Sequence, residues 1–431
     1  MTLGLIAITV VFILTILVSL GLVKEKHYPL CLAVMAAGLV YSITLLGTYV
    51  VGSDIQGELA ASRAVLANGW NFTDATDVNA ITGINMTSVV TGAIAPALST
   101  VLRLDLIWVY KAILPLFLIA VPAVVYKAFE TQIGSKRAFF ATLFFIVMPV
   151  YSLQLAQIVK SMVGELFFAL MILVLVNSWR TVNKVVGITL CLIGAAVSHY
   201  TIGIAMLMYL LGIVVVRLIT TRMAGWWRLW EHRRTPVVAL VVALVIGSAG
   251  FFTYYQFAHS GAVNGVLAGI AGWYVVNPAT EAIAPPPQIP VPTEIQPAFP
   301  TATPKPITVV PEYLYKQEYT VQVGLGLDFF DQPIEGKLFR VLQYLTQLLI
   351  IIGAFRLLFK HSEYRFSAEF VAGIGCSFGL LFICMFVPYF SSIINMPRFY
   401  QISLFFLAPM LVLGCDAIAT IPNAIRRQPT E

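Results

Sequence analysis

The sequence predicts an all-α polytopic membrane protein with about eleven transmembrane helices and two long outer loops. Hydrophobic residues make up 59% and charged residues 11% of the 431 residues, whereas soluble domains carry about 25% charged residues. Apolar runs long enough to cross roughly 30 Å of hydrocarbon recur along the whole chain. A soluble enzyme or a disordered or fibrous protein would not have this composition.

Eleven apolar runs are the expected spans, and the shorter ones are expected to tilt or to be shielded by neighbouring helices. The expected spans cover residues 3–22, 29–50, 106–126, 138–153, 162–178, 185–198, 201–217, 236–256, 339–358, 367–389 and 399–420. The first run lacks a positively charged start and a small-residue cleavage site. We therefore expect an uncleaved membrane helix rather than a signal peptide.

Lysine and arginine divide unequally between the two alternating sets of connections. The shorter connections and the C-terminus carry 17 of these residues, whereas the much longer set that includes 52–105 and 257–340 carries 8. Cytoplasmic loops are enriched in Lys and Arg, so we expect the N-terminus outside and the C-terminus in the cytoplasm. The most basic connection, 217–235, also contains three tryptophans. This pattern favours an interfacial helix on anionic membrane lipid over a nucleic-acid site.

The chain is expected to have three parts. Residues 1–256 form an N-terminal transmembrane module whose outer loop, 52–105, carries an acidic surface helix, residues 257–338 form a proline-rich outer loop, and residues 339–431 form a three-helix transmembrane segment. The proline density between 285 and 306 favours extended polyproline geometry. The aromatic and acidic residues that follow suit either carbohydrate contact or a membrane-interface belt.

The first outer loop begins with the expected surface helix. Ser53 or Asp54 could cap its start, and Gly69 could end it. Asp54 and Glu58 are four residues apart, so both would project from one helix face. Two carboxylates at the outer mouth of a membrane cavity can perform acid–base chemistry or hold a divalent cation. The simpler interpretation is a helix cap and a solvated glutamate.

Four further ionisable residues lie near the outer ends of expected spans, where charges are costly and often functional. Lys160 and Glu165 are about 140° apart around a helix, so they need not pair with each other. His199 could shuttle a proton or contact a phosphate, or it could be a hydrogen-bonded turn residue. Arg398 could fork onto a lipid phosphate or serve as an interfacial anchor.

Other polar side chains receive structural interpretations. Lys111 is expected to snorkel to the interface, and Glu369 and Asp416 are expected to be ordinary boundary residues. All five cysteines lie in apolar stretches, which favours small buried hydrophobes over disulfides or a zinc site.

Two sequons, 71–73 and 85–87, are candidate glycosylation sites. The sequence has no glycine-rich phosphate loop and no zinc-protease helix, which disfavours a nucleotide hydrolase or a metalloprotease.

The stretch from Ser53 and Asp54 through Arg63 to Gly69 and Trp70 resembles the first outer loop of the integral-membrane GT-C glycosyltransferases, in which an acidic residue opens a surface helix that ends at a glycine. The segments 198–200 and 397–400 are similar to those of a poorly characterised, mainly archaeal branch of such proteins. The chain departs from the family pattern because this loop follows the second span rather than the first, and because the next outer loop lacks a clear acidic pair.

The resemblance implies a set of roles. Asp54 would be the general base that activates the acceptor hydroxyl, Lys160 and Arg398 would neutralise the leaving phosphate, and Glu58 and His199 would assist. The donor would be a polyprenyl-phosphate sugar, and the acceptor a protein or a glycan. No metal site is assigned; a divalent cation could take part, although the missing acidic pair argues against a strong dependence on metal.

Three alternatives remain open. A transporter or flippase of lipid-linked saccharides would be expected to have paired charges near the bilayer midplane and an internal repeat with broken helices. A polymerase or ligase of surface polysaccharide would be expected to have an arginine-rich outer loop, whereas the 257–338 loop contains only lysines as cations. A non-catalytic membrane assembly subunit that docks partners on the proline-rich loop is compatible with the sequence.

Overall fold

The computed structural model describes residues 2–70, 85–222, 235–258, 326–359, 364, 366–386 and 396–426. Within these ranges every regular element is helical, which confirms an all-α polytopic membrane protein. Ten of the described helices are long and apolar enough to cross a membrane, and one bent helix pair raises the number to eleven. The predicted interfacial helix at 217–235, the proline-rich stretch and the sequon at 71–73 lie mostly or entirely outside the described residues.

The spanning helices follow the predicted apolar runs. They are α1 (Thr2–Ser19), α2 (Tyr28–Thr44), α7 (Pro115–Ile133), α8 (Ser135–Val147), α9 (Val159–Val176), α10 (Thr181–Ser198), α11 (Tyr200–Arg222), α12 (Val237–Phe257), α15 (Ile334–Phe359), α16 (Ala368–Phe386) and α17 (Met396–Arg426). Three shorter helices, α3 (Ser53–Asn68), α5 (Ala95–Leu102) and α6 (Leu106–Trp108), precede α7.

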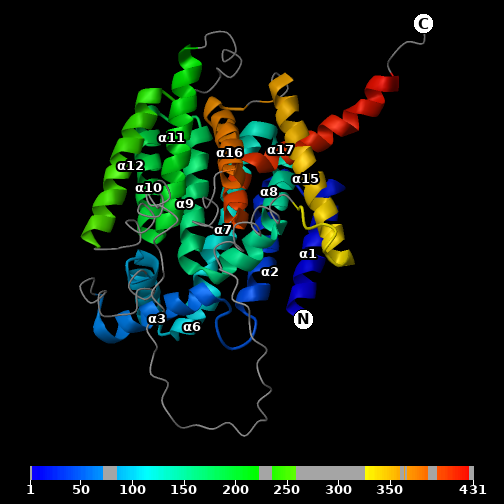
Figure 1. Cartoon of the computed structure of the whole chain (residues 1–431). Coiled ribbons are helices and arrows are strands. Elements are labelled where there is room, and N and C mark those ends of the chain that lie inside the picture. The colour runs from blue at the N-terminus through cyan, green and yellow to red at the C-terminus, as the bar shows by residue number, and fades with distance from the viewer. Residues whose placement is uncertain are drawn as a thin grey trace, which may run out of the picture.

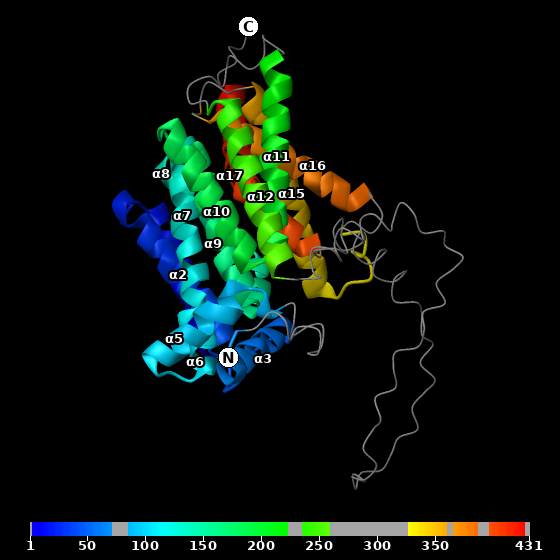
Figure 2. The same ribbon diagram turned by 90° about the vertical axis from the view of Figure 1, so that its left-hand side faces the viewer.

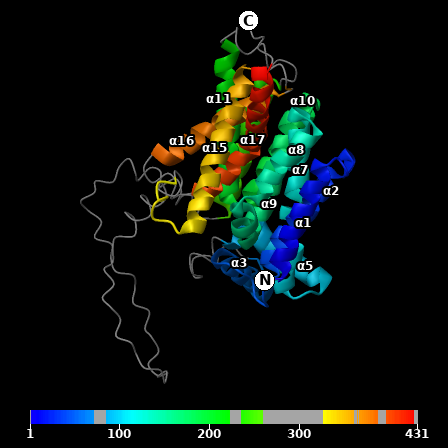
Figure 3. The ribbon, with the colours of Figure 1, turned by 90° about the vertical axis from the view of Figure 1, so that its right-hand side faces the viewer.

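The spanning helices stand side by side in one bundle, and the short helices gather at one of its ends (Figure 1). The other two views agree that α3 and α5 lie at the end where the chain starts, with the C-terminus at the opposite end (Figures 2 and 3). We call these the α3 end and the far end. The first and last described helices reach opposite ends of the bundle, which fits eleven candidate spans when the bent pair is counted as one.

The bent span contains α8, and a proline causes the bend. After Val147 the chain turns by 55° and continues as the helical segment Val150–Gln157. Met148, which precedes Pro149, has the extended conformation (ψ 131), because a proline ring clashes with a helical preceding residue. The bend delivers the chain to the α3 end, where Gln157 contacts Gly52, just before the start of α3.

Lys111 holds the turn that leads from α2 into α3. Its side chain was predicted to snorkel, but the residue is 2% exposed and its ammonium donates to two carbonyl oxygens of the 47–49 turn. Carbonyl groups just beyond a helix end lack intrahelical partners, and a lysine can satisfy them. The second span therefore ends at Thr44 rather than near residue 50.

At the far end, Glu369 is not the boundary residue that was predicted. It is fully buried, its carboxylate accepts a hydrogen bond from the Thr235 N–H (2.8 Å), and it lies 3.7 Å from the Arg217 guanidinium. These contacts join α11, α16 and the residues just before α12. Asp416 is partly exposed and pairs with Arg137 at 2.6 Å, as a boundary residue can.

Two glycines allow α15 and α17 to cross closely. A Cβ atom on Gly353 would overlap the carbonyl oxygen of Met410, and one on Gly414 would overlap that of Leu349. In membranes, small residues are what let two helix backbones approach this closely. Since α17 also carries Arg398, this crossing sets the position of Arg398 relative to the rest of the bundle.

The variant Gly353→Ala is therefore expected to lower the free energy of unfolding by about 1–3 kcal/mol, because the added methyl group forces the two helices apart. The control is Gly375→Ala in α16, where an added Cβ meets nothing within 4 Å. Thermal unfolding of both variants in one detergent measures the difference, and equal stability of the two would contradict the assigned crossing.

Candidate functional site

The surface helix predicted in the first outer loop is α3, and glycines bound it on both sides. Gly52 (φ 123) precedes it and Gly69 (φ 79) follows it, and both angles favour glycine. The prediction that Ser53 or Asp54 caps the helix is wrong, because both lie inside the first turn. The N-cap position is Gly52, which makes no side-chain capping hydrogen bond. Asp54 still faces the favourable positive end of the helix dipole.

A buried hydrogen-bond network fixes α3 against the bundle. The Tyr110 hydroxyl donates to the backbone oxygen of Glu58 (2.9 Å) and lies 2.7 Å from the Ser62 hydroxyl. Ser62 in turn donates to the carbonyl oxygen of Thr91 (2.6 Å). Because these polar groups are buried and mutually satisfied, they hold one rotation of α3 about its axis. That rotation decides where the two carboxylates of α3 point.

Glu58 points into the bundle and caps a second helix. One carboxylate oxygen accepts a hydrogen bond from the Val159 N–H at 2.7 Å, and the other lies 3.8 Å from the Lys160 ammonium. The preceding Ile158 is extended and offers no side-chain cap to α9. Glu58 therefore satisfies a free N–H at the start of α9 and complements its dipole. The alternative of a solvated glutamate is wrong, since the side chain is 0% exposed.

Lys160 connects Glu58 to Asn85, which the sequence suggested only as the asparagine of a glycosylation sequon. Its ammonium donates to the Asn85 side-chain oxygen at 2.6 Å. Asn85 is buried, so the sequon at 85–87 is not accessible for glycosylation in this structure. With a carboxylate on one side and an amide oxygen on the other, the ammonium is held near the surface with its side chain 12% exposed.

Arg398, at the start of α17, pairs with Asp54 at the rim of the site. The distance between Arg398 Nη2 and Asp54 Oδ2 is 3.2 Å. The Asp54 side chain is 51% exposed and that of Arg398 is 27% exposed. The two carboxylates of α3 therefore lie in different surroundings: Glu58 is enclosed, whereas Asp54 faces the outside of the bundle and is available to a molecule that approaches.

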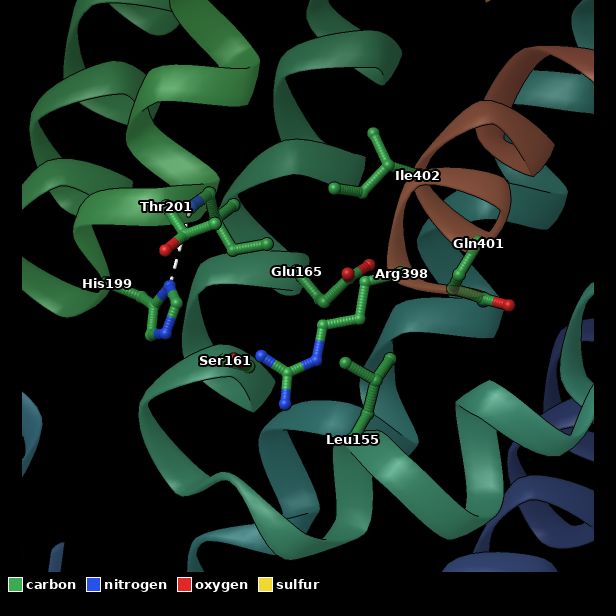
Figure 4. A pocket seen from close by; sticks show the side chains of 9 residues that line it. Leu155, Ser161, Glu165, His199, Thr201, Arg398, Gln401 and Ile402 are labelled. Atoms are coloured by element: carbon green, nitrogen blue, oxygen red, sulfur yellow. Dashed lines mark hydrogen bonds between the residues drawn. The ribbon is translucent and has the colours of Figure 1, made fainter. Parts of the chain in front are cut away.

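Behind Arg398 lies a small cavity of about 10 Å³ (Figure 4). It is lined by Leu155, Ser161, Glu165, His199, Thr201, Ile202, Arg398, Gln401 and Ile402. A cavity of roughly 10–15 Å³ holds one water molecule. A sugar cannot enter it, so any sugar or lipid headgroup at this site must lie at the exposed rim beside Asp54.

His199 is a hydrogen-bonded turn residue, as one of its two interpretations expected, and it also lines this cavity. Its backbone N–H donates to the Ala195 carbonyl oxygen (2.8 Å) at the end of α10, and its ring Nδ1 accepts a hydrogen bond from the Ile202 N–H (3.4 Å). The buried ring stacks on Tyr200 at 5.3 Å between centroids. The turn geometry thus brings an imidazole to the wall of this cavity on the side opposite α17 (Figure 4).

Two residues of the cavity received no role from the sequence. Glu165 is 1% exposed and Gln401 is also 1% exposed. One Glu165 carboxylate oxygen, Arg398 Nε and the Gln401 amide group have no hydrogen-bond partner among the described residues. Gln401 lies one helical turn after Arg398, so both side chains lie on one helix face. This spacing could have predicted Gln401 as a neighbour of Arg398.

The structure brings all five predicted site residues to the α3 end. Asp54 and Glu58 come from α3, Lys160 from α9, His199 from the α10–α11 turn, and Arg398 from α17. Two ion pairs join four of them, Glu58 with Lys160 and Asp54 with Arg398, and His199 lines the cavity together with Arg398. Together they form a rim carboxylate with two cations close behind it, which can accept a proton and can also hold an anion.

In the parts of the chain that the structure describes, no group of three or more His, Cys, Asp or Glu side chains could hold a metal ion. Each carboxylate of α3 faces a cation instead of a second carboxylate. A cation close to a carboxylate competes with a metal ion for the same oxygens.

Burial changes the acid–base behaviour of Glu58. It raises the pKa of this carboxyl from its ordinary 4.5 to about 7, and the nearby Asp54 adds to the rise, while the Lys160 ammonium and the Val159 N–H oppose it. A carboxyl with this pKa exchanges protons near neutral pH. Glu58 can therefore store or release a proton without leaving its place at the start of α9.

Comparison with known protein families finds one match, which is confined to the C-terminal part of the chain. A family model described as "Predicted membrane protein (DUF2206)" matches residues 331–431, which include α15, α16 and α17 and therefore Arg398. No curated protein and no solved structure matches the chain. The family description agrees with the membrane fold and gives no activity.

The raised pKa of Glu58 predicts a pH-dependent stability. The stabilising contribution of a carboxyl whose pKa is raised by folding is present below the ordinary value of 4.5 and is lost as the pH rises through about 7. That interval corresponds to about 3 kcal/mol. Between pH 5 and pH 8 the wild type should therefore lose stability relative to Glu58→Gln by up to this amount, as measured by thermal unfolding in one detergent. A stability gap that stays constant over this range would contradict the assignment.

Proposed function

We propose that this protein is a membrane glycosyltransferase of GT-C type that moves a sugar from a polyprenyl-phosphate donor to a protein or glycan acceptor on the outer face of the cell membrane. The observation that carries the proposal is the half-exposed Asp54 carboxylate, 3.2 Å from Arg398 and next to the Glu58–Lys160 pair. The uneven distribution of lysine and arginine supports an orientation with the N-terminus and the α3 end outside and the C-terminus in the cytoplasm.

The proposed reaction uses the rim carboxylate as a general base. Asp54 takes the proton of the acceptor hydroxyl while that oxygen attacks the anomeric carbon of the donor sugar. The bond between this carbon and the phosphate oxygen breaks, and its electron pair leaves with the polyprenyl phosphate. Arg398 and Lys160 stabilise the negative charge that develops on the leaving phosphate. Glu58 holds Lys160 in place, and His199 assists from behind Arg398.

The Asp54–Arg398 pair suggests an order of binding. While no donor is bound, the ion pair holds the Asp54 carboxylate against the Arg398 guanidinium. A donor phosphate can form a charge-assisted fork with Arg398 and take the place of Asp54. Asp54 would then be free to take the proton of an acceptor hydroxyl only after a donor has bound.

A transporter or flippase remains a less favoured alternative. Such proteins bind substrate near the bilayer midplane, between repeats, whereas the ionisable groups of this site gather at the α3 end of the bundle. A non-catalytic membrane assembly subunit is the other alternative, in which the charged residues of α3 would only hold the helix in place. Neither alternative needs a carboxylate that accepts a proton, so Asp54→Asn separates both from catalysis.

Asp54→Asn is expected to reduce transfer by about 10²–10⁴-fold, because the amide cannot accept the proton. The assay measures sugar transfer in membranes that are supplied with polyprenyl-phosphate sugars. Binding of the donor should be retained, since the Nη2 edge of Arg398 then faces no carboxylate that competes with the phosphate.

The matched control is Asp105→Asn, which removes the same charge at the same end of the bundle. Asp105 accepts a hydrogen bond from the Ile107 N–H at 2.7 Å and caps α6, and asparagine caps a helix equally well. This control should transfer sugar at the wild-type rate. Equal rates for the wild type and Asp54→Asn would remove Asp54 from the chemistry.

The orientation is tested separately by cysteine labelling in a background without the five native cysteines. An impermeant maleimide should label Ser53→Cys in intact cells, because the exposed start of α3 is expected outside. Lys136→Cys, in the exposed first turn of α8 at the far end, should be labelled only after the membrane is permeabilised. The reverse pattern would place the site in the cytoplasm and overturn the proposed reaction with an outer-face acceptor.

A further inference from the structure

Arg398 lies between two carboxylates, of which only one is its ion-pair partner. Asp54 faces the Nη2 end of the guanidinium from the rim. Glu165, on α9, lines the same cavity from the interior, and its carboxylate lies beside the Arg398 side chain (Figure 4). The described residues contain no direct ion pair between Glu165 and Arg398, and a Glu165 carboxylate oxygen and Arg398 Nε both lack a hydrogen-bond partner there.

These two unpartnered groups are unusual because both are buried. A buried carboxylate oxygen or guanidinium N–H without a hydrogen bond is strongly destabilising. Native structures normally resolve such a situation with a protein partner or an ordered water molecule. The cavity between the two residues has about 10 Å³, which is the size needed for one water molecule with several polar neighbours.

We propose that Glu165 is the positioning residue of Arg398 and that one buried water molecule bridges the Glu165 carboxylate to Arg398 Nε. The two edges of the guanidinium then have different tasks. The Nε edge is anchored to the interior of the bundle through Glu165, and the Nη2 edge faces the rim, where Asp54 and an incoming anion compete for it. This assignment of tasks rests on the proposed function only in naming the anion as a donor phosphate.

Glu165 would hold the Arg398 side chain in place while its Nη2 edge exchanges Asp54 for an anion. A guanidinium that leaves Asp54 for a free anion would otherwise gain rotamer freedom and follow the anion into solvent. A second, buried carboxylate holds the side chain in place during the exchange.

The test follows the Arg398 Nε–H directly by NMR, on full-length protein that carries ¹⁵Nε-labelled arginine. The Arg398 signal is the one that Arg398→Lys removes. In the wild type its hydrogen exchange should be slow. Glu165→Gln keeps the shape of the side chain but removes the charge assistance, so exchange should be about tenfold faster. The matched variant Asp54→Asn alters only the Nη2 partner and should change exchange by less than about twofold.

Addition of a short-chain prenyl phosphate distinguishes positioning from general structural support. In the wild type this probe should shift the Arg398 Nη signals while the Nε–H stays protected, because the probe replaces Asp54 and leaves the anchor intact. In Glu165→Gln the same probe should leave the Nε–H unprotected. A high-resolution structure should show density for one water molecule between Glu165 and Arg398 Nε.

Unchanged exchange in Glu165→Gln, or equally fast exchange in Asp54→Asn, would overturn the assignment of Glu165. The result for the proposed function is separate. If the probe leaves the Nη signals in place while Nε–H protection still depends on Glu165, the positioning role stands and Arg398 is not a phosphate ligand. If Glu165→Gln does not fold, Glu165→Asp, which keeps the charge but withdraws it by one methylene, should accelerate exchange to an intermediate extent, and wild-type exchange in that variant would overturn the proposal.

Discussion

The structure at the α3 end depends on one constraint: a charge at the edge of a membrane must have a partner. Two carboxylates on one short surface helix meet two cations on two different spanning helices, and these pairs hold α3 against the bundle. In the enclosed Glu58–Lys160 pair, removing one member leaves the other charge poorly solvated, which is far more costly than the pair is favourable. The position of α3 is therefore coupled to the positions of α9 and α17.

The same helix gives its two carboxylates different chemistry. Glu58 is enclosed and caps α9, whereas Asp54 remains half exposed beside Arg398. Environment, and not residue type, separates the two roles, as it does wherever paired carboxylates act as acid and base. Glu58 is thus part of the support of the site, and Asp54 is the group that a substrate can reach. The proposed order of donor and acceptor binding follows from this difference.

Much of the fold could be predicted from the sequence because its signals are local. Each span is a continuous apolar run, and α3 is bounded by glycines that a local pattern reveals. The ends of the elements were less predictable. The second span stops at Thr44 because Lys111, more than sixty residues later, takes the carbonyl groups of the 47–49 turn. Glu369 was placed wrongly for the same reason: its partners, Arg217 and Thr235, lie far away in the sequence.

The sequence by itself determined the membrane class, the order of the spans and the gathering of charged residues near one end of the bundle, because hydropathy and charge distribution act along a single helix. Only the tertiary structure decided which charges pair, that Asn85 receives Lys160, and that Glu165 and Gln401 face a cavity behind Arg398. A side chain's partner depends on how each helix is rotated about its axis and how closely its neighbours approach. Those quantities result from packing between elements, such as the glycine crossing of α15 and α17, that are distant in the chain.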